Sequence, residues 1–392
     1  MARKNSFEYF NVSKTEKEKV ICFAVGLART DSAEEIENSL DELEELVMAC
    51  DGEVVGRLSQ RKTSIDPGTY LGKGKLEELK QAVIDLGANL LVCDDELSPA
   101  QLRNIEDYCN VRVIDRSLLI LDIFARRAKT SEGKLQVELA QQAYLLPRLQ
   151  AQVGFHSRTG GGIGTRGPGE TIMDRDRRHI KQRMDHLKKE LKKLEERRTL
   201  ARKKKKDKRS FFSIAVVGYT NAGKSTLVNA LCKSDLYTED MVFATLDPSS
   251  RKFVLPEIKD DLVLTDTVGF IRKLPHHLVE AFKSTLEEAA HADLILHVVD
   301  ASDRNSSELV RTSLDLLDEL GAGAVPRIDV LNKMDRIRLE DVSPELFGVL
   351  HSDKSIPTCY ISAKEKEGLD NLKSIVEKKL ISLGAKKWSM DF

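Results

Sequence analysis

The stretch "GYTNAGKST" (218–226) decides the fold of the C-terminal half of this chain. It fits the phosphate-loop pattern G-x-x-x-x-G-K-[ST], follows the apolar run "FSIAVVG" (212–218) and opens a helix-like segment. In such a loop the backbone N–H groups converge on a β-phosphate, and the helix dipole adds to the attraction. We therefore expect a nucleotide to be bound by Gly218, Tyr219, Thr220, Asn221, Ala222, Gly223, Lys224, Ser225 and Thr226.

Three side chains of this loop have separate expected roles. Lys224 should neutralise oxygens of the β- and γ-phosphates and so act in catalysis. The hydroxyl of Ser225 is a natural ligand of Mg²⁺, a hard cation that prefers oxygen. Asn221 has two interpretations, a K⁺ ligand near the β- and γ-phosphate oxygens or a plain turn residue, and the sequence does not choose between them.

The stretch "LTDTVGF" (264–270) supplies D-x-x-G at the end of a predicted strand. Asp266 can hold Mg²⁺ through a water molecule, and the Gly269 N–H can reach a γ-phosphate. Ras-type GTPases carry a glutamine directly after this motif, and it orients the attacking water. Phe270 stands there in this chain. Because a phenyl ring cannot hydrogen-bond water, we expect slow intrinsic hydrolysis and a partner that supplies the missing stabilisation.

The stretch "FATLDPSSRK" (243–252) lies between these two motifs. Thr245 is the candidate for the threonine that binds Mg²⁺ when the γ-phosphate is present, and Phe243 is placed in the same nucleotide-binding segment. The alternative is a threonine in an ordinary loop. If the assignment holds, GTP orders two loops and hydrolysis releases them. The expected catalytic set is then Lys224, Thr245 and Gly269.

The stretch "NKMD" (332–335) at the end of another predicted strand indicates guanine recognition. The Asp335 carboxylate can accept hydrogen bonds from guanine N1–H and from the 2-amino group. Adenine lacks this pair of donors and would leave the carboxylate unpaired. Lys333 can lie along the base plane, and Asn332 can tie its loop back to the phosphate loop.

The stretch "SAK" (362–364) follows the last predicted strand. Ser362, Ala363 and Lys364 complete the expected base site, with the Ala363 N–H facing guanine O6. The four motifs stand in a fixed order on the elements that they need. The sequence therefore predicts GTP and GDP as ligands, with Mg²⁺ as the cofactor.

The N-terminal part of the chain predicts a second α/β domain. Between residues 17 and 125, short apolar runs such as "VICFAVGL" (20–27) alternate with helix-like stretches such as 31–50. This alternation is typical of a small parallel sheet. Within it, "GTYLGKGK" (68–75) places glycines and lysines before a helix, where a phosphate of a nucleotide or RNA could bind.

A helical hairpin is predicted between these two domains. Two apolar stripes with heptad-like spacing indicate two helices packed along a seam. They are formed by Leu135, Leu139, Gln142, Leu146 and Leu149, and by Ile180, Met184, Leu187, Leu191 and Leu194. Between them, residues 154–170 hold seven glycines with Arg158 and Arg166. We expect this stretch to form the tip of the hairpin, and Pro147 to end or kink the first helix.

The expected fold class is α/β, with an N-terminal parallel domain, a long antiparallel hairpin and a C-terminal P-loop (Ras-like) domain. The expected domain bounds are 1–128 for the N-terminal domain, 129–210 for the hairpin and its basic linker, 211–384 for the P-loop domain and 385–392 for a tail.

Charge is segregated along the 392 residues, although the net charge is only −1. Residues 175–209 contain 18 Lys/Arg and 6 Asp/Glu, so the rest of the chain is acidic. This basic run is either a solvated helix face or a surface for a phosphate backbone. The six cysteines form no C-x-x-C pair, the N-terminus has no apolar signal, and no apolar run approaches about 20 residues. We therefore expect a reduced cytoplasmic protein without a membrane span.

The motifs together resemble one family over nearly the whole chain. "GGGIGTRGPGET" (160–171) before a basic helix, combined with the phosphate loop and "FATLDPSSR" (243–251), is similar to the HflX family of ribosome-associated GTPases. The resemblance implies a monomer that binds the large (50S) ribosomal subunit and its rRNA and splits stalled or stress-inactivated 70S ribosomes. It also implies ribosome-stimulated hydrolysis and ATP binding by the N-terminal domain.

The resemblance gives the glycine-rich tip a function. It implies that the tip reaches ribosomal RNA, with Arg158 and Arg166 on phosphates; the alternative is a plain connector. Two other functions stay open for the whole chain. One is an ATP-dependent RNA remodeller working through the N-terminal domain, and the other is a ribosome-assembly switch.

Overall fold

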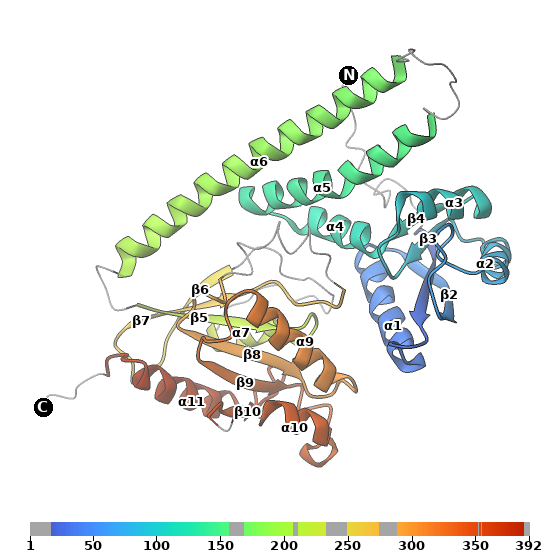
Figure 1. The fold of residues 1–392 in the computed structure, drawn as a ribbon. Helices are drawn as coiled ribbons and strands as arrows, with labels where there is room; N and C mark the ends of the chain where they lie inside the picture. Colours follow the sequence, from blue (N-terminus) through green and yellow to red (C-terminus); the bar gives the residue numbers. More distant parts are fainter. Residues whose placement is uncertain are drawn as a thin grey trace, which may run out of the picture. The chain divides into compact units, whose positions relative to one another are not determined.

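The computed structural model describes residues 17–156, 168–206, 211–232, 249–273, 288–351, 353 and 355–387 (Figure 1). Residues 157–167 of the predicted glycine-rich tip lie outside these ranges, with Arg158 and Arg166, and so do Phe243 and Thr245. The chain divides into two compact units. The first comprises Met1–Leu191 with Lys273–Ala281, and the second comprises Lys192–Arg272 with Phe282–Phe392.

The first unit contains the predicted parallel sheet. All its strand pairs run parallel, in the order β2-β1-β3-β4. The strands are β1 (Lys19–Leu27), β2 (Glu53–Lys62), β3 (Leu90–Cys93) and β4 (Arg112–Asp115). The helices that join them are α1 (Ala33–Ala49), α2 (Lys73–Leu86) and α3 (Pro99–Cys109). The central strands are apolar because helices cover both faces of such a sheet.

Two of these helices begin where the local sequence dictates. At the start of α1, the Ser32 hydroxyl accepts the Glu35 N–H at 3.0 Å, and the Glu35 carboxylate accepts the Ser32 N–H. Ser98 and Gln101 form the same capping box on α3. Each such cap stabilises its helix by about 1 kcal/mol. By contrast, α2 of the "GTYLGKGK" stretch begins after Gly72 without a side-chain cap.

A buried ion pair lies just after the ends of β3 and β4. Arg116 is 1% exposed, and its guanidinium contacts Asp94 at 2.7 Å and Glu42 at 3.0 Å. Lys273, from the short segment that belongs to this unit, also contacts Asp94 at 2.5 Å. Burial raises the pKa of Asp94, but Arg116 and Lys273 outweigh it and the pKa lies below its usual value. The pairing keeps the buried carboxylate charged.

Helix α4 (Arg116–Arg127) follows β4, and the region of the predicted hairpin forms α5 (Ser131–His156) and α6 (Pro168–Lys206). Helix α5 packs against α4. It continues past Pro147 to His156, so of the two expected effects, ending or kinking the helix, this proline does not end it. A proline inside a helix removes one hydrogen bond and clashes with the preceding turn.

The apolar stripe predicted on α6 is less exposed than most of the other described residues of the helix. Leu187 is fully buried, and the other stripe residues are half-buried, whereas most residues between them are exposed. Arg183 fixes α6 to α5 through two hydrogen bonds with Glu138, at 2.6 and 2.8 Å.

The second unit is a six-stranded sheet in the order β10-β9-β8-β5-β7-β6, in which only the β6–β7 pair is antiparallel. Its strands are β5 (Phe211–Gly218), β6 (Ser249–Phe253), β7 (Asp261–Asp266), β8 (Leu294–Asp300), β9 (Arg327–Asn332) and β10 (Thr358–Tyr360). Its helices are α7 (Lys224–Cys232), α9 (Ser306–Glu319), the 3₁₀ turn Leu339–Asp341, α10 (Pro344–Leu350) and α11 (Leu369–Ser382).

One strand of this sheet lies earlier than predicted. The sequence "FVLPEI" (253–258) indicates a strand, but β6 ends at Phe253. Pro256, three residues further on, has no N–H to donate to a neighbouring strand, which disfavours a strand that runs through it. The pairing is instead made by residues 249–253 with β7.

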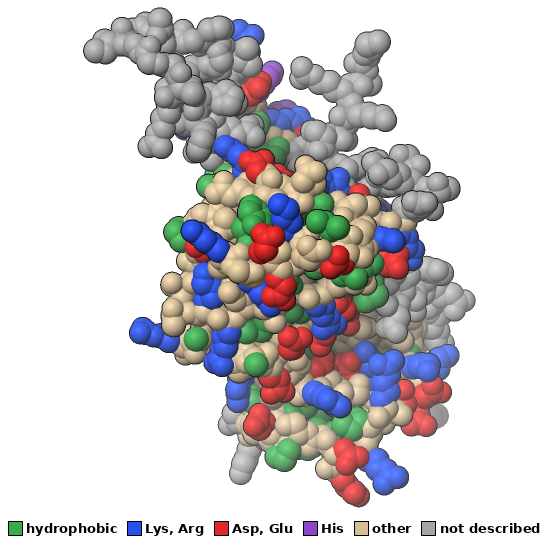
Figure 2. Space-filling view, turned by 90° about the vertical axis from the view of Figure 1, so that its right-hand side faces the viewer, with side chains coloured by type: hydrophobic (Ala, Val, Ile, Leu, Met, Phe, Trp, Pro, Cys, Tyr) green, Lys and Arg blue, Asp and Glu red, His purple; other side chains and the backbone are tan. Residues whose placement is uncertain are grey.

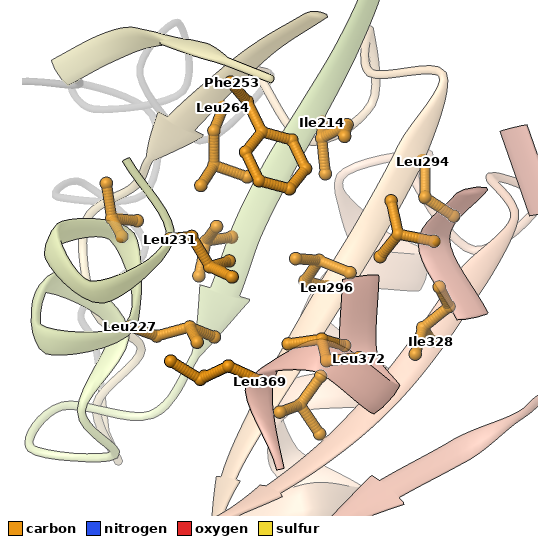
Figure 3. Close-up of a cluster of buried hydrophobic side chains, with 14 of the residues drawn as sticks. Ile214, Leu227, Leu231, Phe253, Leu264, Leu294, Leu296, Ile328, Leu369 and Leu372 are labelled. Carbon is orange, nitrogen blue, oxygen red and sulfur yellow. The ribbon is translucent and has the colours of Figure 1, made fainter. Parts of the chain in front are cut away.

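The larger buried cluster of the second unit lies between its sheet and the helices α7 and α11, and a second cluster joins the sheet to α9 and α10. Figure 3 shows Ile214, Leu264, Leu296 and Ile328 of four neighbouring strands meeting Leu227 of α7 and Leu369 and Leu372 of α11. Because these strands are parallel, their carboxyl ends share one edge, where open α/β sheets bind ligands.

Charged side chains of both signs are interspersed on the face shown in Figure 2. Within the described ranges, no helix is long and apolar enough to cross a membrane.

Truncation of Leu296 should test the core that supports this edge. Leu296 is 0% exposed, so Leu296→Ala should destabilise the second unit by about 2–5 kcal/mol through the cavity that it leaves. Urea unfolding followed by circular dichroism measures the loss. Val254→Ala, at a side chain that is 69% exposed, is the matched control and should change little. Equal effects of the two substitutions would contradict this view of the core.

Candidate active site

The phosphate loop joins β5 to α7, as the sequence predicts. The loop is closed by Gly223, whose φ is +91°, and a Cβ built there would lie 2.3 Å from Nδ2 of Asn332. Only glycine therefore fits between the loop and Asn332. Asn221, exposed at the loop, also has a positive φ, of +61°.

Lys224 is buried at the start of α7. Its ammonium donates a hydrogen bond of 2.7 Å to the Tyr219 carbonyl of the same loop. Burial lowers the pKa of Lys224 to about 8, although Asp266 acts in the opposite direction. A phosphate would bring the anionic oxygens that this buried ammonium lacks. The Lys224 side chain is therefore placed to bind phosphate at the mouth of the loop.

Two oxygen ligands lie together beside Lys224. The Ser225 hydroxyl donates to Oδ2 of Asp266 at 2.6 Å. Ser225 stands in the first turn of α7, and Asp266 is the fully buried last residue of β7. A hydroxyl next to a carboxylate is a donor set that fits Mg²⁺. The residues predicted to hold Mg²⁺ are thus brought together, except Thr245, which is not among the described residues.

The D-x-x-G segment pairs with the phosphate loop, which the sequence does not predict. The Thr220 N–H donates to the Phe270 carbonyl at 2.8 Å, and the Phe270 N–H donates to the Gly218 carbonyl at 3.0 Å. A Cβ at Gly269 would lie 2.8 Å from Thr220 and 2.9 Å from Nζ of Lys224, so glycine is required here as well. Phe270 itself is 2% exposed and faces the interior.

Asn332 connects the two sides of the site. Its Nδ2 donates to the Ala222 carbonyl at 2.9 Å, which is the tie to the phosphate loop that the sequence predicts. Its Oδ1 accepts the Ala363 N–H at 2.9 Å. The Ala363 N–H was assigned to guanine O6, but in this structure it donates to Asn332. Contact with O6 would require this hydrogen bond to be shared or exchanged.

The base-recognising carboxylate is held by the "SAK" loop. The Ser362 hydroxyl donates to Oδ1 of Asp335 at 2.6 Å, and this hydrogen bond lowers the pKa of Asp335 below its usual value. Asp335 is therefore ionised at neutral pH, as an acceptor for two guanine donors must be. Lys364 is mostly exposed, with 75% of its side-chain surface accessible.

Two contacts of this site escape the sequence motifs. The Arg272 N–H donates to Oη of Tyr219, so the tyrosine side chain also holds the segment after D-x-x-G. Asp300, the last residue of β8, forms an ion pair with Lys333. The acidic end of the apolar run "DLILHVVD" (293–300) is the one signal in the sequence that points to Asp300.

Three protein families match successive parts of the chain. Residues 37–125 match a family described as GTP-binding GTPase N-terminal, and residues 127–205 match GTP-binding GTPase Middle Region. Residues 213–333 match a family described as 50S ribosome-binding GTPase.

Similar proteins match most of this chain over most of their own length. A protein named GTPase HflX from Caldanaerobacter subterraneus subsp. tengcongensis is 50% identical over 93% of this chain and 81% of its own length. GTPase HflX of Escherichia coli is 44% identical over 78% of this chain and 71% of its own length. A crystal structure of SsGBP in complex with GDP matches with a TM-score of 0.52 and 26% identity, over 93% of this chain and 99% of that one.

The buried ammonium of Lys224 makes nucleotide binding depend on pH. Because its pKa of about 8 lies below that of an exposed lysine, the nucleotide-free site loses the charge as pH rises through 8. Phosphate stabilises the charged form, so at pH 8 GDP binding should take up about half a proton, and affinity should weaken towards pH 9. Titration calorimetry in buffers of different ionisation enthalpy measures the uptake.

The matched control is Lys224→Arg, studied at saturating GDP. A guanidinium stays charged at these pH values, so this variant should lack the component of proton uptake that Lys224 supplies. Identical uptake by both proteins would show that another group titrates.

Proposed function

The chain belongs to the HflX family of GTPases, and from this premise we propose that its GTP-bound form docks on the large (50S) ribosomal subunit and separates stalled or stress-inactivated 70S ribosomes. As a member of this family it binds and hydrolyses GTP. Hydrolysis then releases the protein from the subunit. It acts in the cytoplasm, as a monomer on the ribosome.

The observation that carries the ribosome proposal is the basic surface of α6. This helix has 39 residues and so rises about 58 Å. Lys181, Lys189 and Lys192 are exposed along it. A row of cations at this spacing suits an RNA backbone, whose phosphates release counterions when they are neutralised. The family description of residues 213–333, 50S ribosome-binding GTPase, names the RNA-rich particle that fits such a surface.

The proposed roles of the site residues are based on their positions in the site. Lys224 binds the β- and γ-phosphate oxygens after it exchanges the Tyr219 carbonyl for them. The Gly269 N–H contacts the γ-phosphate, and Asp335 selects guanine. Phe270 is buried and leaves the attacking water without a side chain to orient it, so the ribosome supplies this stabilisation. Phe243 and Thr245 are proposed to contribute to nucleotide binding.

The proposed metal ligands are Ser225, Thr245 and, through water, Asp266. Bound there, Mg²⁺ would neutralise charge on the phosphate oxygens. Asn221 is proposed to hold K⁺ beside the phosphates, because an amide oxygen suits a hard cation and the residue is exposed at the loop. ATP is proposed as a second ligand, held by the N-terminal unit.

Ribosome-dependent turnover tests the proposed function. We expect slow GTP hydrolysis by the protein alone and at least a 100-fold rise with large subunits, since a correctly placed stabilising group contributes about 10²–10³ in rate. With a non-hydrolysable GTP analogue the protein should sediment with large subunits and convert 70S particles into subunits; with GDP it should not. Equal turnover with and without ribosomes, or intact 70S particles, would refute the proposal.

A neutral α6 surface should weaken docking without changing the nucleotide site. The variant K181Q/K189Q/K192Q should bind large subunits more weakly, and its salt dependence of log K should fall by about 0.7–0.9 for each lysine that contacts a phosphate. Sedimentation at several salt concentrations measures both values. A control that removes the same charge from other exposed positions should bind normally, namely K252Q/K378Q/K386Q. Equal losses in the two variants would remove α6 from the interface.

A further inference from the structure

We propose that Asp300 is a positioning residue of the guanine site, which holds the side chain of Lys333 in place for the base. Oδ2 of Asp300 lies 2.7 Å from Nζ of Lys333. Only 17% and 13% of the two side-chain surfaces are exposed, so the pair is largely removed from water. The inference deepens GTP recognition and is independent of the ribosome.

The two residues are also joined through the backbone. Asp300 ends β8 and pairs in register with Asn332, the last residue of β9. The Ala301 N–H donates to the Asn332 carbonyl at 3.0 Å. The position of Asn332, where the guanine loop begins, is therefore fixed by these contacts with the end of β8. Asp300 stands directly beside that point, so its carboxylate reaches Lys333 without a flexible connection.

The backbone of Lys333 has an uncommon conformation, and the partner restricts its long side chain. Its φ is +63°, in the left-handed region that non-glycine residues rarely adopt. The turn is held on its far side, where the Met334 N–H donates to the Ile361 carbonyl at 3.1 Å. A lysine side chain has four rotatable carbon bonds, and a free one loses much rotamer freedom when it is laid against a base. The ion pair with Asp300 restricts it before the nucleotide arrives, which strengthens binding.

The other oxygen of Asp300 has a separate task, and this makes a clean variant available. Oδ1 accepts the Ser302 N–H at 3.0 Å and the Ser302 hydroxyl at 2.6 Å. Asp300→Asn keeps an oxygen for Ser302 but places an NH₂ group against the Lys333 ammonium. The substitution therefore breaks the ion pair with Lys333 and preserves the hydrogen bonds with Ser302.

Nucleotide affinity tests the proposal. Asp300→Asn should weaken GDP and GTP by the same factor, about 10-fold, equivalent to 1.4 kcal/mol. In the GTPase reaction the KM for GTP should rise, while kcat at saturating GTP stays unchanged. The reason is that Lys333, which loses its partner, contacts the base and not the γ-phosphate. Asp300→Glu keeps the charge and should retain more affinity than Asp300→Asn. Ser302→Ala leaves the ion pair intact and should bind as the unchanged protein does.

A double-mutant cycle separates positioning from general support of the fold. In the background Lys333→Met, the further change Asp300→Asn should cause no additional loss of affinity, since its partner is already gone. Losses that multiply in the double variant would overturn the proposal. So would a lower melting temperature of nucleotide-free Asp300→Asn with unchanged affinity, or equal affinities of the Asn and Glu variants.

Discussion

The nucleotide site depends on one buried amide, the side chain of Asn332. Its NH₂ group holds the phosphate loop at the Ala222 carbonyl, and its oxygen holds the Ala363 N–H of the last loop. An amide offers a donor and an acceptor in one plane, so a carboxylate of the same size could not serve both partners. Asn332 is 2% exposed, and water therefore does not compete for these bonds. The loops that contain Ala222 and Ala363, residues 141 positions apart in the sequence, are both held by this side chain.

The places of the motifs in the fold were predictable, because each motif is short and stands at the end of a strand. The β5–α7 turn, the end of β7 and the loop after β9 all lie where the motifs place them. Contacts between motifs were harder to predict, since they depend on how distant loops approach each other. The pairing of Phe270 with the phosphate loop is of this kind, and so is the partner of the Ala363 N–H. The first is a pair of backbone bonds, which leave no trace in residue type, and the second joins a backbone N–H to the side chain of a residue 31 positions away.

In the first unit, too, local patterns were predictable and contacts between distant segments were not. Alternating apolar and helical segments predict its parallel sheet, because strands covered on both faces must be apolar throughout. Local rules left the effect of Pro147 open, since a proline can either end a helix or kink it, and α5 continues through this one. Arg116 also escaped prediction. Nothing in "VIDRSLL" (113–119) shows that this arginine is buried between Asp94 and Glu42.

The two backbone hydrogen bonds of Phe270 form a short ladder, and opening it would add an energetic cost to binding the γ-phosphate, which GTP has and GDP lacks. Any movement of Gly269 towards a γ-phosphate must strain or break the two hydrogen bonds that Phe270 makes with Gly218 and Thr220. Each contributes about 1 kcal/mol, so roughly 2 kcal/mol of the γ-phosphate's attraction would go into opening this ladder. GDP makes no such demand. A γ-phosphate that displaces Gly269 would therefore bind less tightly by this amount, and a docking surface that favours the opened ladder would restore the affinity.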